Sequence, residues 1–125
     1  MARRESLYHD FPDYRVDLEP NPEHVRVSFA GELLADSRRT LIVRETKHEP
    51  VVYVPKQDVR FERLEPTDHE SFCPFKGEAR YWTIRVEGRV EENAVWGYEA
   101  PFEQVSGLAG YVAFYPDRVE WEVSS

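Results

Sequence analysis

The chain has 125 residues, of which 41% are apolar, and this is enough for one domain with a sizeable core. Its 24 acidic and 16 basic side chains give a net charge of −8, which disfavours binding to nucleic acid or to acidic membranes, because both need basic surfaces. The single cysteine excludes an internal disulfide and a four-cysteine zinc site. The polar start predicts no signal peptide and no apolar run reaches about 18 residues, so we expect a cytoplasmic protein.

Residues 1–13 are predicted to be a polar N-terminal arm, followed by a single domain over residues 14–125. Residues 15–18 alternate briefly between charged and apolar side chains, which predicts a short edge strand. Residues 24–29 alternate cleanly between apolar and polar side chains, which predicts a half-buried strand. Residues 33–35 are expected to return antiparallel to it.

Asp36 and Ser37 then favour a turn, because both side chains can bond nearby backbone amides. Residues 40–45 are rich in β-branched side chains and apolar on both faces, which is typical of a central strand. Residues 51–54 predict another strand, ended by Pro55.

Residues 65–77 contain prolines 66 and 74 and predict the longest polar connection, of a length that is often functional. Residues 79–86 then alternate, with Trp82, Ile84 and Val86 on one side and Tyr81, Thr83 and Arg85 on the other. A strand is therefore expected to follow the connection.

Residues 94–98 predict a short strand, and residues 101–105 predict one short helix that Gly107 and Gly110 would end. Residues 111–115 and 118–123 flank Pro116-Asp117 and predict a closing hairpin. The sum of about eight to ten short strands and at most one short helix predicts an all-β, mostly antiparallel sandwich, tent or open barrel.

The most distinctive motif is Cys-Pro-Phe-Lys-Gly at residues 73–77, followed by Tyr81-Trp82. This motif and further landmarks make the chain resemble a family of bacterial and fungal domains of unknown function, often labelled nucleotidyltransferase-like. The resemblance covers about residues 14–123. The landmarks are Val27, Phe29, Gly31, Ala35-Asp36-Ser37, Glu45, Tyr53, Pro55, Asp58-Val59, Ala79, Trp96, Tyr98, Pro101 and Ala113-Phe114-Tyr115. The resemblance implies a β-tent fold. The paired CxxC zinc motifs of the wider β-tent group are absent, so no metal or cofactor is predicted.

Cys73 and Lys76 are the first candidate site residues. A nearby cation such as Lys76, or His69, would lower the pKa of a cysteine nucleophile. The alternative is a buried structural thiol. Lys76 could bind an anionic group of a ligand, or lie exposed at a turn.

A set of aromatic side chains is dense enough to form a cage for a flat or cationic ligand, or simply to pack in the core. The set is Tyr53, Trp82, Trp96, Tyr98 and Tyr115. Glu45, at the end of its strand, could add a polar contact or be solvated. Asp36, Glu45 and Asp58 are the carboxylates that nucleotidyl transfer could use on a divalent metal.

The leading hypothesis is a small-molecule-binding domain whose aromatic pocket is walled by Trp82, Trp96 and Tyr98, with Lys76, Glu45 and Cys73 as polar contacts. The second hypothesis is an enzyme that uses Cys73 or Glu45 in acyl or nucleotidyl chemistry. The third is an interaction module in which the edge at residues 119–123 pairs with another chain, for instance in a homodimer.

Overall fold

The computed structural model describes residues 6–125. They form ten β-strands in two antiparallel sheets, joined by loops and 3-10 turns, with no α-helix among them. The all-β fold predicted from the sequence is confirmed. The strands are β1 (Val16–Pro20), β2 (His24–Phe29), β3 (Glu32–Ser37), β4 (Leu41–Glu45), β5 (Val51–Pro55), β6 (Leu64–Cys73), β7 (Gly77–Val86), β8 (Arg89–Gly97), β9 (Tyr111–Phe114) and β10 (Glu120–Ser124). The 3-10 turns are η1 (Tyr8–Asp10), η2 (Lys56–Asp58), η3 (Phe61–Arg63), η4 (Glu103–Leu108) and η5 (Pro116–Arg118).

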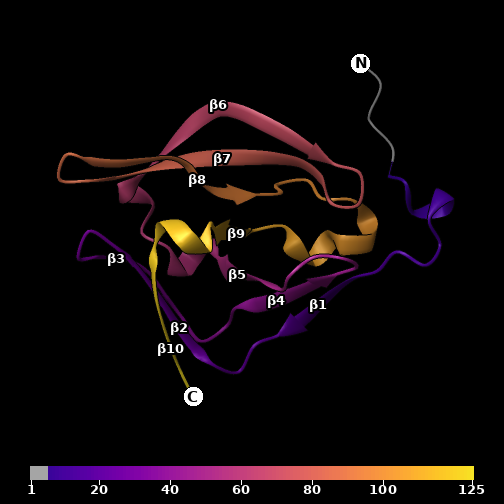
Figure 1. Cartoon of the computed structure of the whole chain (residues 1–125), viewed down its shortest axis with the longest axis horizontal. Helices are drawn as coiled ribbons and strands as arrows, with labels where there is room; N and C mark the ends of the chain where they lie inside the picture. Colours follow the sequence, from indigo (N-terminus) through magenta and orange to yellow (C-terminus); the bar gives the residue numbers. More distant parts are fainter. Residues whose placement is uncertain (1–5) are drawn as a thin grey trace.

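The larger sheet has seven strands in the order β1-β4-β5-β9-β8-β7-β6, and the smaller sheet has three in the order β10-β2-β3 (Figure 1). In Figure 1 the β6–β8 end of the large sheet lies at the top, and the small sheet crosses below it on the left. None of the helical turns within residues 6–125 is long and apolar enough to cross a bilayer.

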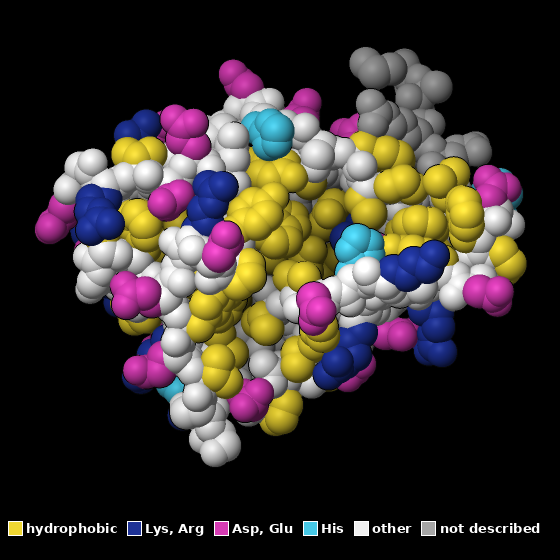
Figure 2. Space-filling view, viewed as in Figure 1, with side chains coloured by type: hydrophobic (Ala, Val, Ile, Leu, Met, Phe, Trp, Pro, Cys, Tyr) yellow, Lys and Arg dark blue, Asp and Glu magenta, His cyan; other side chains and the backbone are white. Residues whose placement is uncertain are grey.

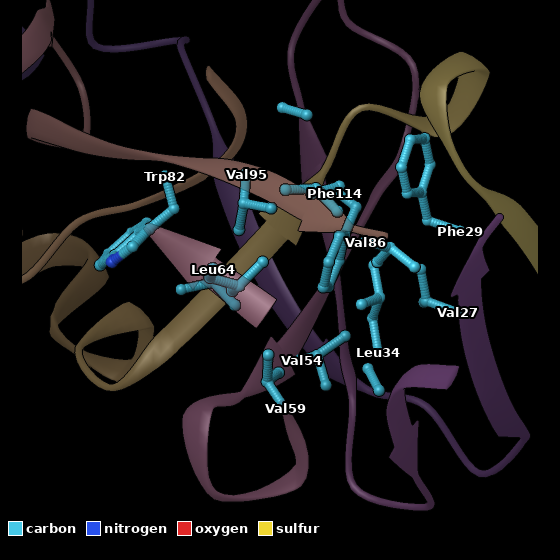
Figure 3. Packing of buried hydrophobic residues seen from close by; sticks show 14 of the residues in the cluster. Val27, Phe29, Leu34, Val54, Val59, Leu64, Trp82, Val86, Val95 and Phe114 are labelled. Atoms are coloured by element: carbon cyan, nitrogen blue, oxygen red, sulfur yellow. The ribbon is translucent and has the colours of Figure 1, made fainter. Parts of the chain in front are cut away.

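The first apolar cluster lies between the two sheets and forms the main core. Val27 of β2 and Leu34 of β3 are fully buried, and they face Val54, Ile84 and other side chains of the large sheet. Figure 3 shows side chains of both sheets pointing into this cluster. The face of the large sheet that contributes to it is called the core face.

The opposite face of the large sheet, called the outer face, carries a second cluster that includes Val43, Tyr53, Tyr81, Tyr98 and Ala113. The two clusters follow from the two-residue repeat of a strand, which sends neighbours to opposite faces. Tyr53 and Val54 are therefore in different clusters.

Part of the outer face is covered by η4. Val105 and Leu108 of this turn are 1% and 0% exposed and belong to the second cluster. Gly107 lies so close to β1 that a Cβ there would be 3.1 Å from Cδ2 of Leu18. The short helix predicted near residues 101–105 is thus a 3-10 turn, Glu103–Leu108.

Two sequence predictions about the middle of the chain are wrong. Most of the polar connection predicted at residues 65–77 is strand β6, and only residues 74–76 connect it to β7. Asp36 and Ser37 lie on strand β3 rather than in a turn, although the Ser37 hydroxyl does accept a hydrogen bond from the Arg39 backbone amide at 3.0 Å. β6 is an edge strand whose ladder shifts between Pro66 and Glu70, so its proline and its charged side chains are tolerated.

The predicted closing hairpin is also wrong. β9 pairs with β5 and β8 in the large sheet, whereas β10 pairs with β2 in the small sheet. Between them, η5 redirects the chain from one sheet to the other. The strand predicted to be central at residues 40–45 is β4, which is second from the edge of its sheet.

Candidate functional site

A pocket of about 600 Å³ opens on the outer face of the large sheet. Figure 2 shows hydrophobic side chains gathered around a hollow on the visible face of the molecule. Six aromatic rings line the pocket, from Tyr14, Tyr53, Phe72, Phe75, Trp96 and Tyr98. Its polar and sulfur-containing side chains are Glu45, His48, Glu49, Cys73 and Lys76.

The sheet register places two of these rings next to each other. Tyr53 of β5 and Trp96 of β8 both lie opposite Ala113 of the intervening strand β9. Because Ala113 is small, the two rings meet across it edge to face, with centroids 6.2 Å apart. Trp96 Nε1 donates a hydrogen bond to the Tyr53 hydroxyl at 3.2 Å, so the indole is held in one orientation.

The Cys-Pro-Phe-Lys-Gly motif is the tight turn between β6 and β7. Lys76 N–H donates to the Cys73 carbonyl at 3.2 Å, and Pro74 suits the second position of such a turn. Gly77 has a φ of +115°, which side chains rarely adopt and which explains the glycine. The turn directs Lys76 into the pocket.

Lys76 and Glu45 form an ion pair with little access to water. Lys76 Nζ contacts Glu45 Oε1, and the two side chains are only 9% and 10% exposed. The Tyr14 hydroxyl donates to Glu45 Oε2, and His48 Nε2 lies 3.7 Å from that oxygen. Of the two alternatives left open for Glu45, the polar contact holds and the solvated strand end does not.

The ionised form of Glu45 is favoured. Burial alone would raise the pKa of Glu45, but hydrogen bonds from Lys76 and Tyr14 and the charge of Lys76 outweigh it and lower that pKa below its ordinary value of 4.5. Burial also raises the pKa of the Tyr98 hydroxyl and, with the hydrogen bond to Glu45, that of Tyr14. The tyrosines of the pocket are therefore neutral hydrogen-bond donors.

The described part of the predicted N-terminal arm packs against the turn, whereas residues 1–5 of that arm lie outside the described residues. Leu7 N–H donates to the Pro74 carbonyl at 3.1 Å, and the Tyr8 hydroxyl donates to the Phe75 carbonyl at 2.5 Å. The ring of Tyr14 stacks on Phe75 with centroids 3.6 Å apart. This segment closes one side of the pocket.

Cys73 is a free, partly exposed thiol in the pocket lining. His69 does not line the pocket, because its ring packs against Tyr81 with centroids 4.4 Å apart. The histidine that does line it is His48, three residues after Glu45. Its proximity to Glu45 in the sequence was the signal that could have identified it.

The prediction that Trp82 walls the pocket is wrong. Trp82 belongs to the core-face cluster and meets Phe61 edge to face at 5.7 Å. Its neighbour Tyr81 pairs with Trp96 across β7 and β8 and shares the outer face with it. Tyr115 also lies outside the lining, tilted against Trp96 at 4.6 Å.

The three carboxylates considered for metal-dependent nucleotidyl transfer are engaged in separate interactions. Asp36 bonds to His24 and Arg26, and Asp58 bonds to Ser37 and Arg39. Neither joins Glu45 in the pocket. Within residues 6–125, no group of three or more histidine, cysteine or acidic side chains could hold a metal ion.

Comparison with protein families gives a match over residues 17–125, to the family described as Domain of unknown function (DUF427). The chain belongs to this family. The resemblance seen in the sequence is thereby confirmed. All pocket-lining residues except Tyr14 fall inside the DUF427 match. No curated protein matches the chain.

The DUF427 domain is expected to lose the contribution of Glu45 to its stability in acid. Because the folded-state pKa of Glu45 is lowered, this contribution is complete above the ordinary pKa of 4.5 and is lost as the pH falls through the folded-state value. Urea unfolding from about pH 6 downwards should therefore show the stability difference between the wild type and Glu45→Gln shrinking below pH 4.5. The exposed Glu49, which has no ion-pair partner within residues 6–125, provides the control, and Glu49→Gln should follow the wild type throughout.

Proposed function

We propose that the pocket binds a small planar molecule. The observation that supports this most directly is the convergence of six aromatic rings and a buried ion pair on one pocket of about 600 Å³. Binding sites for small molecules have similar volumes, mostly apolar walls and a few placed polar groups. Flat ligands gain from stacking on aromatic faces.

Contacts within the protein hold the walls of the pocket in place, which favours binding because less side-chain entropy is lost. Trp96 is fixed by the Tyr53 hydroxyl, and Lys76 is fixed by Glu45. Tyr14 is fixed by stacking on Phe75, with ring planes 12° apart. A ligand would enter a site that is already ordered.

Thermal-shift measurements against nucleosides, imides, pyrimidines and methylated amines test the proposal. A compound present at 100 times its Kd should stabilise the folded chain by about 2.7 kcal/mol, which is a clear rise in melting temperature for a chain of this size. Replacing Trp96 with leucine should weaken binding about fivefold or more, since a lost stacking contact costs about 1–3 kcal/mol.

Trp121→Leu is the matched control. Trp121 is partly buried like Trp96 and also donates one hydrogen bond, to the Pro116 carbonyl at 3.2 Å, but it lies on β10 of the small sheet. It should leave the ligand affinity unchanged. The proposal fails if no compound of the panel raises the melting temperature, or if both substitutions weaken binding equally.

Cytoplasmic location, homodimer formation and the absence of nucleic-acid and membrane partners stay predictions from the sequence.

A further inference from the structure

We propose that the ligand is a neutral planar ring that carries a carbonyl oxygen, rather than a cation. This inference rests on the proposed function and narrows it to one chemical class. It depends on two features of the pocket: a cation of the protein already lies beside the rings, and the hydroxyls of Tyr98 and Tyr53 donate to no acceptor among residues 6–125.

The cation is Lys76. Its Nζ lies 5.9 Å from the ring centroid of Tyr98, within the range at which an ammonium group interacts with an aromatic face. The carboxylate that could attract a cationic ligand is Glu45, and it is already bonded by Lys76 and Tyr14. A second cation in the pocket would therefore meet the Lys76 ammonium group without a free buried counter-charge.

An anionic ligand is disfavoured for the complementary reason. The positive charge of Lys76 is compensated by Glu45 at contact distance, and a ligand carboxylate would lie near that carboxylate. The remaining acidic side chain of the lining, Glu49, is exposed. Solvent screens its charge, so Glu49 neither attracts a cationic ligand nor repels an anionic one strongly. The balance of charges favours a neutral ligand.

The hydroxyl of Tyr98 is the first donor without an acceptor. Tyr98 lines the pocket and is 7% exposed, and within residues 6–125 its hydroxyl donates to no protein acceptor. Because no fully buried polar side-chain atom in this part of the chain lacks a partner, the hydroxyl opens to the pocket. Because burial raises the pKa of this hydroxyl, it keeps its proton at neutral pH. A donor that opens to the pocket and has no acceptor in the protein can bond to a ligand that supplies one.

The hydroxyl of Tyr53 is the second donor. It accepts the hydrogen bond of Trp96 Nε1 at 3.2 Å, and its own hydrogen has no acceptor in the described part of the chain. Burial raises the pKa of Tyr53 as well. Two neutral O–H donors beside aromatic walls fit a carbonyl oxygen on a flat ring.

A matched pair of probes tests the charge. Nicotinamide is a neutral planar ring with a carbonyl oxygen, and 1-methylnicotinamide adds one methyl group and one positive charge. Binding can be followed by the indole N–H signals in ¹H–¹⁵N NMR spectra, since the chain has three tryptophans and Trp96→Phe identifies the signal of the pocket. Nicotinamide should shift the Trp96 signal and leave those of Trp82 and Trp121 in place. The methylated cation should bind at least about tenfold more weakly.

Tyr98→Phe tests the donor, because it removes the hydroxyl and keeps the ring. It should weaken nicotinamide binding about three- to tenfold, as expected for one lost hydrogen bond. Tyr111→Phe is the control, since Tyr111 belongs to the outer-face cluster but does not line the pocket, and it should leave the affinity unchanged.

Two outcomes overturn this inference alone: equal or tighter binding of 1-methylnicotinamide at Trp96, or unchanged nicotinamide affinity in Tyr98→Phe. If no nicotinamide compound and no compound of the thermal-shift panel affects the Trp96 signal, the proposed function fails together with the inference.

Discussion

Replacing Lys76 with methionine is expected to lower the free energy of unfolding by about 3–5 kcal/mol, because it leaves the buried Glu45 carboxylate without its cation. Both side chains of the pair are at most 10% exposed, so water compensates little of the loss. Urea denaturation at pH 7 followed by tryptophan fluorescence measures the change.

Two variants separate charge pairing from packing. The double variant Lys76→Met/Glu45→Leu should recover most of the lost stability, because neither charge then remains buried. Arg85→Met breaks the exposed Arg85–Glu65 pair, whose nitrogen and oxygen lie 3.0 Å apart and whose side chains are both 56% exposed. It should cost no more than about 1 kcal/mol. Equal losses in Lys76→Met and Arg85→Met would contradict the assignment of a buried pair.

Replacing Phe114 with alanine is the second change with a large expected effect, about 3–5 kcal/mol. Phe114 lies on β9, in the middle of the large sheet, and is 1% exposed. Its ring meets Trp121 of the small sheet edge to face at 6.5 Å, so its loss leaves a cavity between the two sheets (Figure 3). Urea denaturation monitored by far-UV circular dichroism measures the loss.

The control for Phe114 is Val123→Ala. Val123 lies on β10 and is 50% exposed, so its replacement should change the unfolding free energy by less than about 0.5 kcal/mol. A loss below about 1 kcal/mol in Phe114→Ala would indicate that the two sheets are not joined through this side chain.

The strands were predictable wherever local alternation was strong, as in β2 and β7. Strand pairing was not, because it depends on contacts between distant residues. Pro116-Asp117 looks like a hairpin turn, but the next strand pairs with β2, about ninety residues earlier. β6 was missed because its charged residues and its proline suit an exposed edge strand as well as a loop.

The same limit applies to the pocket. Tyr53, Trp96 and Tyr98 were expected to meet Cys73, Lys76 and Glu45, and all six line the pocket. Trp82 was placed on the wrong face of the sheet. Of the adjacent rings Tyr81 and Trp82, the one that shares the face of Trp96 is decided by strand pairing, which sets Tyr81 opposite Trp96.

Tyr14 and His48 were missed for a different reason. Tyr14 lies in a segment that the sequence marks only as polar, and it reaches the pocket by stacking on Phe75. His48 shows no ligand spacing with the other histidines and enters the lining through the turn that follows Glu45.

Neighbours such as Tyr53 and Val54 on β5, Val95 and Trp96 on β8, and Val112 and Ala113 on β9 belong to opposite faces of the large sheet, one packed between the sheets and one lining or supporting the pocket. Under the proposed function, substitutions at Tyr53, Trp96 or Tyr98 are expected to alter ligand preference and to leave the packing between the two sheets unchanged. Insertion or deletion of one residue within these strands would move the side chains of the core face to the outer face and the reverse. It would therefore disrupt both the core and the pocket. Natural variation in this site is thus expected to consist of replacements within strands, with length changes confined to the connecting loops.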